Sequence, residues 1–295
     1  MRFSLPAYAK INLTLEVLGR RDDGYHEIMT VLQTIDLWDS LTFESGTPIE
    51  LSCDDISLES ADNLILKAAH LLKEETGYDS GAYIFLTKKI PTAAGLGSGA
   101  TDAATTLVGL NRLWNLNLPI ERLQDLAARI GSDVAFFLYG GTALAKGRGE
   151  LITKLPSLPE TWLVLATPTT ERLPNKTAQL YSRLDKSHFT NGRYTDKLIE
   201  SIIRKQHIGN DLLYNIFEHV AFDFFDQIKI QRSKLEKEEA KRIHLAGSGP
   251  ALFILVSNRQ HGENIRKNLE DSNVQTYLIH TLESSPFDFL KDESC

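Results

Sequence analysis

Three glycines at alternate positions, Gly95, Gly97 and Gly99, mark the stretch of this sequence best suited to chemistry. A segment typical of a strand, residues 82–90, precedes them, and a helical pattern over 101–114 follows. A glycine-rich turn that opens a helix presents free backbone N–H groups at the positive end of the helix dipole. Because glycine also lets a bulky anion approach the backbone, the spacing predicts a polyphosphate-binding loop.

Two named nucleotide motifs fit this loop poorly. A Walker loop requires a lysine after its last glycine, and none follows here. Residues 95–100 fit a loose dinucleotide fingerprint, but residues 115–120 lack the strand that should end in an acidic residue. A glycine turn without a ligand remains the alternative to a phosphate site.

Lys10 and Asp133 are the residues best suited to phosphoryl transfer. Lys10 is the only charged residue in the segment 3–15, and Asp133 follows the helix-ending Gly131 and opens an apolar helix. An ammonium stabilises charge that develops in the transition state, and a carboxylate accepts the acceptor's proton. If the two meet in a cleft, we expect Lys10 to keep Asp133 ionised. The alternatives are an edge-strand lysine that reaches solvent and a simple N-cap.

Other polar side chains suit ligand binding. Tyr25 and His26 can stack on a flat ring and hydrogen-bond to it; the alternative is a tyrosine packed in a turn beside a surface histidine. The hydroxyls of Ser98 and Thr101 can bind phosphate or assist Mg²⁺, or else cap the helix. The histidines show no metal-ligand spacing, so we predict no metal site built by the protein alone.

The strands and helices expected to position these residues are mixed along the chain and do not alternate strictly, which predicts an α+β fold. In the first half we expect strands at 3–18 (a pair broken around Lys10), 28–37, 40–43, 82–90 and 142–145, with helices at 62–76, 101–114, 120–130 and 134–138. In the second half we expect strands at 162–166, 251–256 and 274–280, with helices at 176–184, 195–206, 211–228 and 260–270, and a solvated helical face over 229–242. Prolines 156 and 159 indicate a boundary, giving domains 1–155 and 156–295.

Composition excludes several classes of protein. The 295 residues carry a net charge of −7, which argues against general affinity for nucleic acid or an anionic membrane. The two cysteines, Cys53 and Cys295, cannot build a disulfide framework. No apolar run reaches membrane-spanning length. From these features we expect a cytoplasmic, reduced protein. We also expect a small-molecule substrate, and a monomer or homodimer.

Five motifs together resemble the GHMP kinase superfamily. They occupy residues 9–13 (AKINL), 24–27 (GYHE), 91–104, 131–137 and 246–250. The first two motifs are similar to those of one branch of the superfamily, whose acceptor substrate is a methylerythritol linked to cytidine diphosphate. The resemblance implies an N-terminal domain like ribosomal protein S5 domain 2, a ferredoxin-like C-terminal domain, and ATP-dependent phosphorylation of the acceptor's 2-hydroxyl in the non-mevalonate isoprenoid pathway.

The resemblance also implies roles for individual residues. Lys10 and Asp133 match the catalytic pair, and Asn12, Tyr25, His26 and Thr167 match the acceptor site. ATP, with Mg²⁺ carried mainly by the nucleotide, is expected on the loop residues Pro91, Ala94, Gly95, Leu96, Gly97, Ser98, Gly99, Ala100 and Thr101.

This chain departs from the family pattern at two places. Ser98, Ala100 and Thr101 replace the usual Gly, Ser and Ser of the loop. Thr169, Thr170 and Glu171 stand where some members place a second aromatic ring on cytosine, so we expect Tyr25 to be the single platform. A kinase for homoserine, mevalonate or an isoprenoid monophosphate, and a nucleotide-binding sensor without turnover, are the alternative functions.

Overall fold

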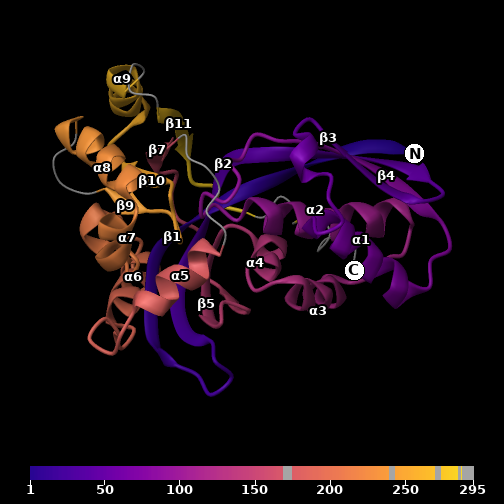
Figure 1. Ribbon diagram of the computed structural model, residues 1–295, viewed down its shortest axis with the longest axis horizontal. Coiled ribbons are helices and arrows are strands. Elements are labelled where there is room, and N and C mark those ends of the chain that lie inside the picture. The colour runs from indigo at the N-terminus through magenta and orange to yellow at the C-terminus, as the bar shows by residue number, and fades with distance from the viewer. Residues whose placement is uncertain (169–174, 239–242, 270–273, 285–286, 288–295) are drawn as a thin grey trace.

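A long strand pair runs through the computed structural model and links its two parts (Figure 1). The structure describes residues 1–168, 175–238, 243–269, 274–284 and 287. Strands β1 (Arg2–Arg20) and β2 (His26–Gly46) pair antiparallel along their length. Register shifts interrupt the pairing, one of them between Tyr8 and Lys10. The expected strand pair at 3–18 was therefore wrong: it is one strand with a local irregularity beside Lys10.

The first sheet has seven strands in the order β3-β4-β2-β1-β8, with β5 paired to β2 and β6. The added strands are β3 (Ile49–Cys53), β4 (Gly81–Thr87), β5 (Thr142–Gly147), β6 (Leu151–Lys154) and β8 (Tyr214–Asn215). Helices on one side of this sheet are α1 (Leu64–Thr76), α2 (Ser98–Leu113), α3 (Ile120–Ile130) and α4 (Val134–Tyr139), with a short 3₁₀ turn, η1 (Ile56–Leu58) (Figure 1). Apolar residues of the strands and helices form a shared core, including Phe43, Leu107 and Phe136.

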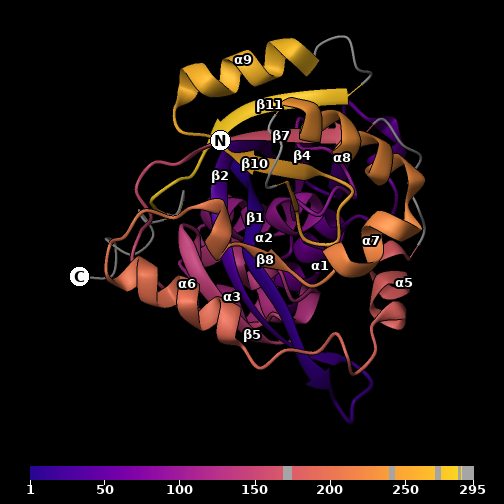
Figure 2. The ribbon, with the colours of Figure 1, turned by 90° about the vertical axis from the view of Figure 1, so that its left-hand side faces the viewer.

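The second sheet has four antiparallel strands in the order β11-β7-β10-β9. They are β7 (Trp162–Pro168), β9 (His244–Leu245), β10 (Leu252–Leu255) and β11 (Val274–His280). The helices of this half are α5 (Lys176–Arg183), α6 (Arg193–Ile203), α7 (Glu218–Phe224), α8 (Asp226–Glu238) and α9 (Arg259–Leu269), with η2 (Asn210–Leu212). Figure 2 shows α9 packed along β11 at the outer side of the sheet.

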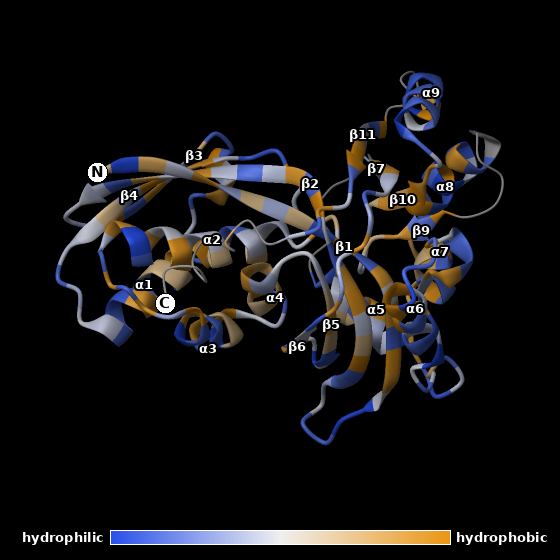
Figure 3. Ribbon diagram, turned by 180° about the vertical axis from the view of Figure 1, so that it is seen from behind, coloured by the Kyte–Doolittle hydropathy of each residue, from blue (hydrophilic) through white to orange (hydrophobic). Residues whose placement is uncertain are grey.

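One apolar cluster joins the two halves. It combines Ile11 and Leu13 of β1 and Leu96 of the glycine loop with Leu165 and Phe253 of the second sheet. Figure 3 shows the apolar segments of β1 and β10 meeting where the two halves join. The core between the halves therefore fixes the glycine loop against the second sheet.

The predicted α+β class is confirmed, but one expected helix was wrong. Residues 211–228 form η2, β8, α7 and the start of α8 instead of one helix. Asn215 ends any helix there because its side-chain amide donates to the carbonyls of Leu245 and Gly247, at 2.8 and 2.7 Å. The proposed domain boundary at 155 falls between β6 and β7 and stays a prediction. None of the helices in the described ranges is long and apolar enough to cross a membrane.

Candidate active site

A cavity of about 1720 Å³ lies between the two halves. Its lining brings together nearly all the residues that the sequence singled out: Lys10, Asn12, Tyr25, His26, Pro91, Ala94, Gly95, Leu96, Gly97, Ser98, Gly99, Ala100, Asp133 and Thr167. Thr101 is the exception, because it is only 2% exposed and does not line the cavity. Of the two hydroxyls predicted for phosphate or Mg²⁺, only Ser98 thus lines the cavity.

Lys10 is a buried cation held in place from three directions. Its backbone N–H donates to the carbonyl of Leu96 at 3.0 Å, which ties β1 to the glycine loop. Its Nζ lies 2.8 Å from Asn12 Oδ1 and 3.6 Å from Asp133 Oδ2. The side chain is 5% exposed, so it is not a lysine that reaches out to solvent. Its charge is instead directed at Asp133.

Asp133 precedes α4, but its side chain makes no capping hydrogen bond. The carboxylate is 45% exposed and lines the cavity. The N-cap explanation therefore does not account for this residue. A carboxylate that is paired with a buried ammonium and open to a cavity is suited to orient and deprotonate a hydroxyl.

The glycine loop opens α2 at Ser98. Gly97 is the N-cap with φ 73°, and no side chain occupies the cap, so the first N–H groups of α2 are left for a ligand. A Cβ at Gly97 would lie 2.5 Å from the Phe137 ring and 3.2 Å from Lys10 Cγ. Only glycine fits where the loop passes Phe137 and Lys10.

A second glycine turn, residues 246–250, interlocks with this loop. A Cβ at Gly95 would lie 1.9 Å from the Ala246 carbonyl oxygen, and one at Gly247 would lie 3.3 Å from Lys10 Nζ. Ala251 N–H also donates to the carbonyl of Ala94 at 3.3 Å. The turn from the second half thus completes the wall of the cavity around Lys10.

Aromatic side chains occupy the end of the cavity near the β1–β2 turn. Tyr25 is 57% exposed, and the Arg148 guanidinium lies 4.9 Å from its ring centroid. His26 stacks on Tyr181 with ring centroids 4.7 Å apart. Burial lowers the pKa of His26, with Arg20 adding to the effect. A neutral imidazole offers one donor and one acceptor to a base edge.

Comparison with known proteins agrees with this geometry. Residues 63–141 match the family described as GHMP kinases N terminal domain. A 4-diphosphocytidyl-2-C-methyl-D-erythritol kinase from Dehalococcoides mccartyi strain BAV1 is 41% identical over 279 residues, covering 95% of this chain and 98% of the relative. The enzyme of that name from Bacillus cereus strain B4264 is 39% identical over 291 residues, covering 96% and 98%.

A solved structure is similar over the same extent. The crystal structure of a 4-(cytidine 5'-diphospho)-2C-methyl-D-erythritol kinase superposes with a TM-score of 0.80 at 31% identity, covering 95% of this chain and 99% of that one. The chain belongs to this kinase family. The fold is accordingly that of the GHMP kinases, and the protein is a small-molecule kinase.

Two features of this kinase were missed from the sequence. Residues 169–171, which carried the expectation of a single aromatic platform, lie outside the described residues. Tyr181 of α5 nevertheless lines the cavity, with its ring stacked on His26. Its helical spacing makes it look like an ordinary core residue, so only the position of α5 reveals it.

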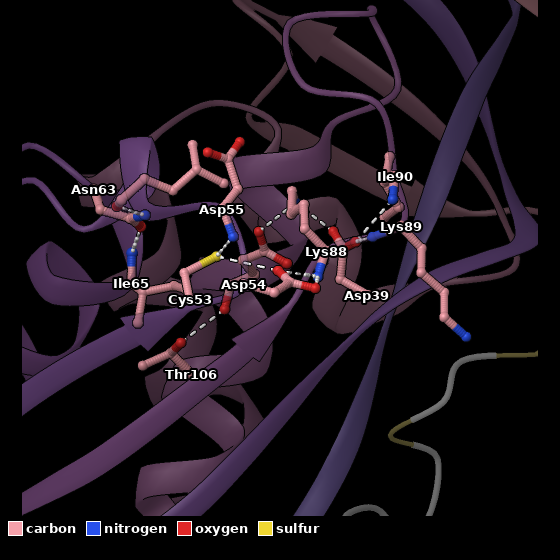
Figure 4. A network of polar contacts seen from close by, with 12 residues as sticks. Asp39, Cys53, Asp54, Asp55, Asn63, Ile65, Lys88, Lys89, Ile90 and Thr106 are labelled. Atoms are coloured by element: carbon pink, nitrogen blue, oxygen red, sulfur yellow. Dashed lines mark hydrogen bonds and ion pairs between the residues drawn. The ribbon is translucent and has the colours of Figure 1, made fainter. Parts of the chain in front are cut away.

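The second missed feature is an ion cluster at the base of the loop. Lys88 Nζ contacts Asp39 and lies 2.8 Å from Asp102 Oδ2, and Asp39 also accepts the backbone N–H of Ile90 at 2.8 Å (Figure 4). Lys88 precedes the loop and Asp102 follows it. The cluster therefore fastens the two ends of the glycine loop to each other and to β2.

A smaller cavity of about 280 Å³ adjoins this cluster and the start of α2. Its lining includes Asn63, Leu64, Lys88, Thr92 and Gly99. No group of three or more His, Cys, Asp or Glu side chains within the described ranges is placed to hold a metal ion.

Proposed function

We propose that this kinase transfers the γ-phosphoryl group of ATP to the 2-hydroxyl of 4-diphosphocytidyl-2-C-methyl-D-erythritol. The observation that carries the proposal is the Lys10–Asp133 pair, 3.6 Å apart, between the glycine loop and the aromatic end of one cavity. The near full-length relatives named for this acceptor support its identity.

Asp133 and Lys10 divide the chemistry. The Asp133 carboxylate accepts the hydroxyl proton as the oxygen attacks the γ-phosphorus, and the bond between that phosphorus and ADP breaks. Lys10 offsets the negative charge that gathers on the transferred group. Asn12 lines the cavity, as expected of a substrate ligand, but its contacts also support positioning. Its Oδ1 holds Lys10, and its Nδ2 donates to Thr30 Oγ1 at 2.8 Å.

The aromatic end of the cavity suits a cytidine diphosphate. Tyr25 offers a ring face for stacking, and neutral His26, supported by the Tyr181 ring, offers hydrogen bonds to the base edge. Arg148, which lies over Tyr25, supplies the positive charge that a diphosphate requires. Thr167 completes the lining at the second sheet.

ATP fits the loop and the smaller cavity beside it. Its phosphates would meet the N–H groups that open α2, and its base the pocket beside Asn63 and Leu64. The Ser98 hydroxyl is an oxygen donor that suits Mg²⁺, which supplies charge neutralisation when it binds with ATP. Both substrates are polyanions that do not cross membranes unaided, so we propose that the enzyme acts in the cytoplasm. We also propose that it acts as a monomer or homodimer.

A panel of acceptors tests the assignment by coupled detection of ADP. We expect release of ADP with 4-diphosphocytidyl-2-C-methyl-D-erythritol and little with homoserine, mevalonate or isoprenoid monophosphates. Faster turnover of any of those three would replace the proposed acceptor. ATP binding without ADP formation on every acceptor would instead indicate a nucleotide sensor.

A further inference from the structure

Lys176, the first residue of α5, is a buried cation that the mechanism above does not use. Its Nζ donates to the carbonyl of Ala93 at 2.6 Å and also to the carbonyl of Gly249. Ala93 belongs to the glycine loop, and Gly249 belongs to the interlocking turn. An ammonium has three N–H donors, and contacts with the described residues use two of them, so one is left for a ligand.

The surroundings of Lys176 favour an anion. Across the described residues, no carboxylate forms an ion pair with it, although burying an ammonium without a counter-charge is costly. Burial, together with the charge of Lys10, lowers the pKa of Lys176 to about 8. Two ammonium groups that repel each other across one cavity are both stabilised when a polyanion binds between them.

The interlocking turn places both lysines at the same point of the cavity. A Cβ at Gly247 would lie 3.3 Å from Lys10 Nζ, and two residues later the Gly249 carbonyl accepts from Lys176. Lys10 faces Asp133, where the transferred phosphoryl group must sit if the mechanism holds. Lys176 therefore lies near Lys10, beside the position proposed for the terminal phosphate.

We propose that Lys176 is a second phosphate-binding ammonium, which contacts the terminal phosphate of ATP with its remaining N–H. The inference rests on the proposed assignment of the glycine loop to ATP. The competing explanation is a purely structural clamp between the two turns. The two differ in what they predict for ATP and ADP, because only ATP carries the terminal phosphate.

The test is equilibrium binding of ATP and ADP, each with Mg²⁺, measured by titration calorimetry. Lys176→Gln keeps an amide donor for the carbonyls without the charge, Lys176→Met removes both, and Lys176→Arg keeps the charge. We expect the Gln and Met variants to bind ATP about ten-fold more weakly and ADP less than about two-fold more weakly, since one charge-assisted hydrogen bond is lost. Lys186→Met, at an exposed lysine just after α5, should change neither.

The pH dependence gives a second readout. The charged groups around Lys176 are Lys10 and, elsewhere in the cavity lining, Arg20, His26, Arg148, Asp133, Tyr181 and Asp226. Wild-type affinity for ATP should fall above about pH 8, where free Lys176 loses its proton. Lys176→Arg should remove that fall, because a guanidinium stays charged.

Gly99→Asp separates the two proposals. Gly99 is exposed in the first turn of α2, and a Cβ there meets only Leu64 Cδ1 at 3.6 Å, so a carboxylate should repel phosphate without disturbing the fold. Unchanged ATP affinity in Gly99→Asp would overturn the loop assignment. Suppose that Gly99→Asp weakens ATP binding, so that the loop assignment holds. If the folded Lys176→Gln and Lys176→Met variants then bind ATP and ADP equally weakly, or as tightly as the wild type, the role of Lys176 alone is overturned. A ten-fold loss specific to ATP would support it.

Discussion

Lys10 and Asp133 face each other across the cavity with their charged groups 3.6 Å apart, yet their surroundings differ sharply. Lys10 is enclosed and held by Asn12 and the glycine loop, whereas Asp133 is nearly half exposed and free of capping contacts. The cation is therefore fixed in advance, and the carboxylate is the partner that can meet an incoming hydroxyl. This asymmetry matches a pair in which one member stabilises charge and the other accepts a proton.

Removing the carboxylate should abolish most turnover without unfolding the protein. Asp133→Asn is nearly isosteric and breaks no described cap, so we expect the melting temperature to be preserved and kcat to fall about 10²- to 10⁴-fold. Lys10→Met should lower kcat similarly. Because the two residues act on one step, the double variant should lose little beyond the worse single variant. The assignment would be contradicted if the losses of kcat in the two single variants multiplied in the double variant, or if Asp133→Asn kept a normal kcat.

The aromatic residues should control affinity for the acceptor and not for ATP. Loss of a ring that stacks on a base costs about 1–3 kcal/mol, so Tyr25→Ala should raise the acceptor's KM about 5- to 150-fold. Tyr181→Ala should also raise it, because His26 loses the ring that supports it. The KM for ATP should hardly change. Tyr83→Ala, an exposed tyrosine on β4, is the matched control and should leave both constants unchanged. A rise in KM for ATP alone would exclude stacking on the acceptor.

The two glycine turns should tolerate no side chain at their contact. Gly95→Ala would place a Cβ 1.9 Å from the Ala246 carbonyl oxygen at a φ of +85°, so we expect a loss of about 1–3 kcal/mol in the free energy of unfolding. Gly99→Ala meets only Leu64 at 3.6 Å and should be close to neutral. Urea unfolding of both variants measures the difference. Equal stability would show that the turns do not interlock in solution.

The ion cluster below the loop should make stability depend on pH. Burial raises the pKa of Asp102 to about 7, with Asp39 adding to the effect and Lys88 opposing it. The folded state therefore holds this proton more tightly than the unfolded chain, whose aspartate pKa is about 3.9. The contribution of Asp102 to the free energy of unfolding should fall as pH rises from about 4 to about 7. Asp102→Asn should flatten that slope in urea titrations; an unchanged slope would assign it to other groups.

The sequence alone predicted a phosphate-binding loop and singled out most of the residues that line one cavity with it. Alternate glycines between a strand and a helix predict free N–H groups wherever the chain folds, because the backbone conformation there is local. Lys10, Asp133, Tyr25 and His26 were identifiable as unusual residues in their own segments, and the order of the motifs gave the superfamily. The local alternatives of N-cap and solvent-reaching lysine stayed open, since nothing local distinguishes them.

Only the tertiary structure decided which of these side chains meet. The core of the first half holds α4 together with β1, where Lys10 reaches Asp133. A third core packs α5 against β1 and β2, where Tyr181 reaches His26. The tertiary structure also buried Thr101 and split the helix expected at 211–228. These outcomes depend on burial and on hydrogen bonds between distant segments, and periodicity within one segment carries no information about either.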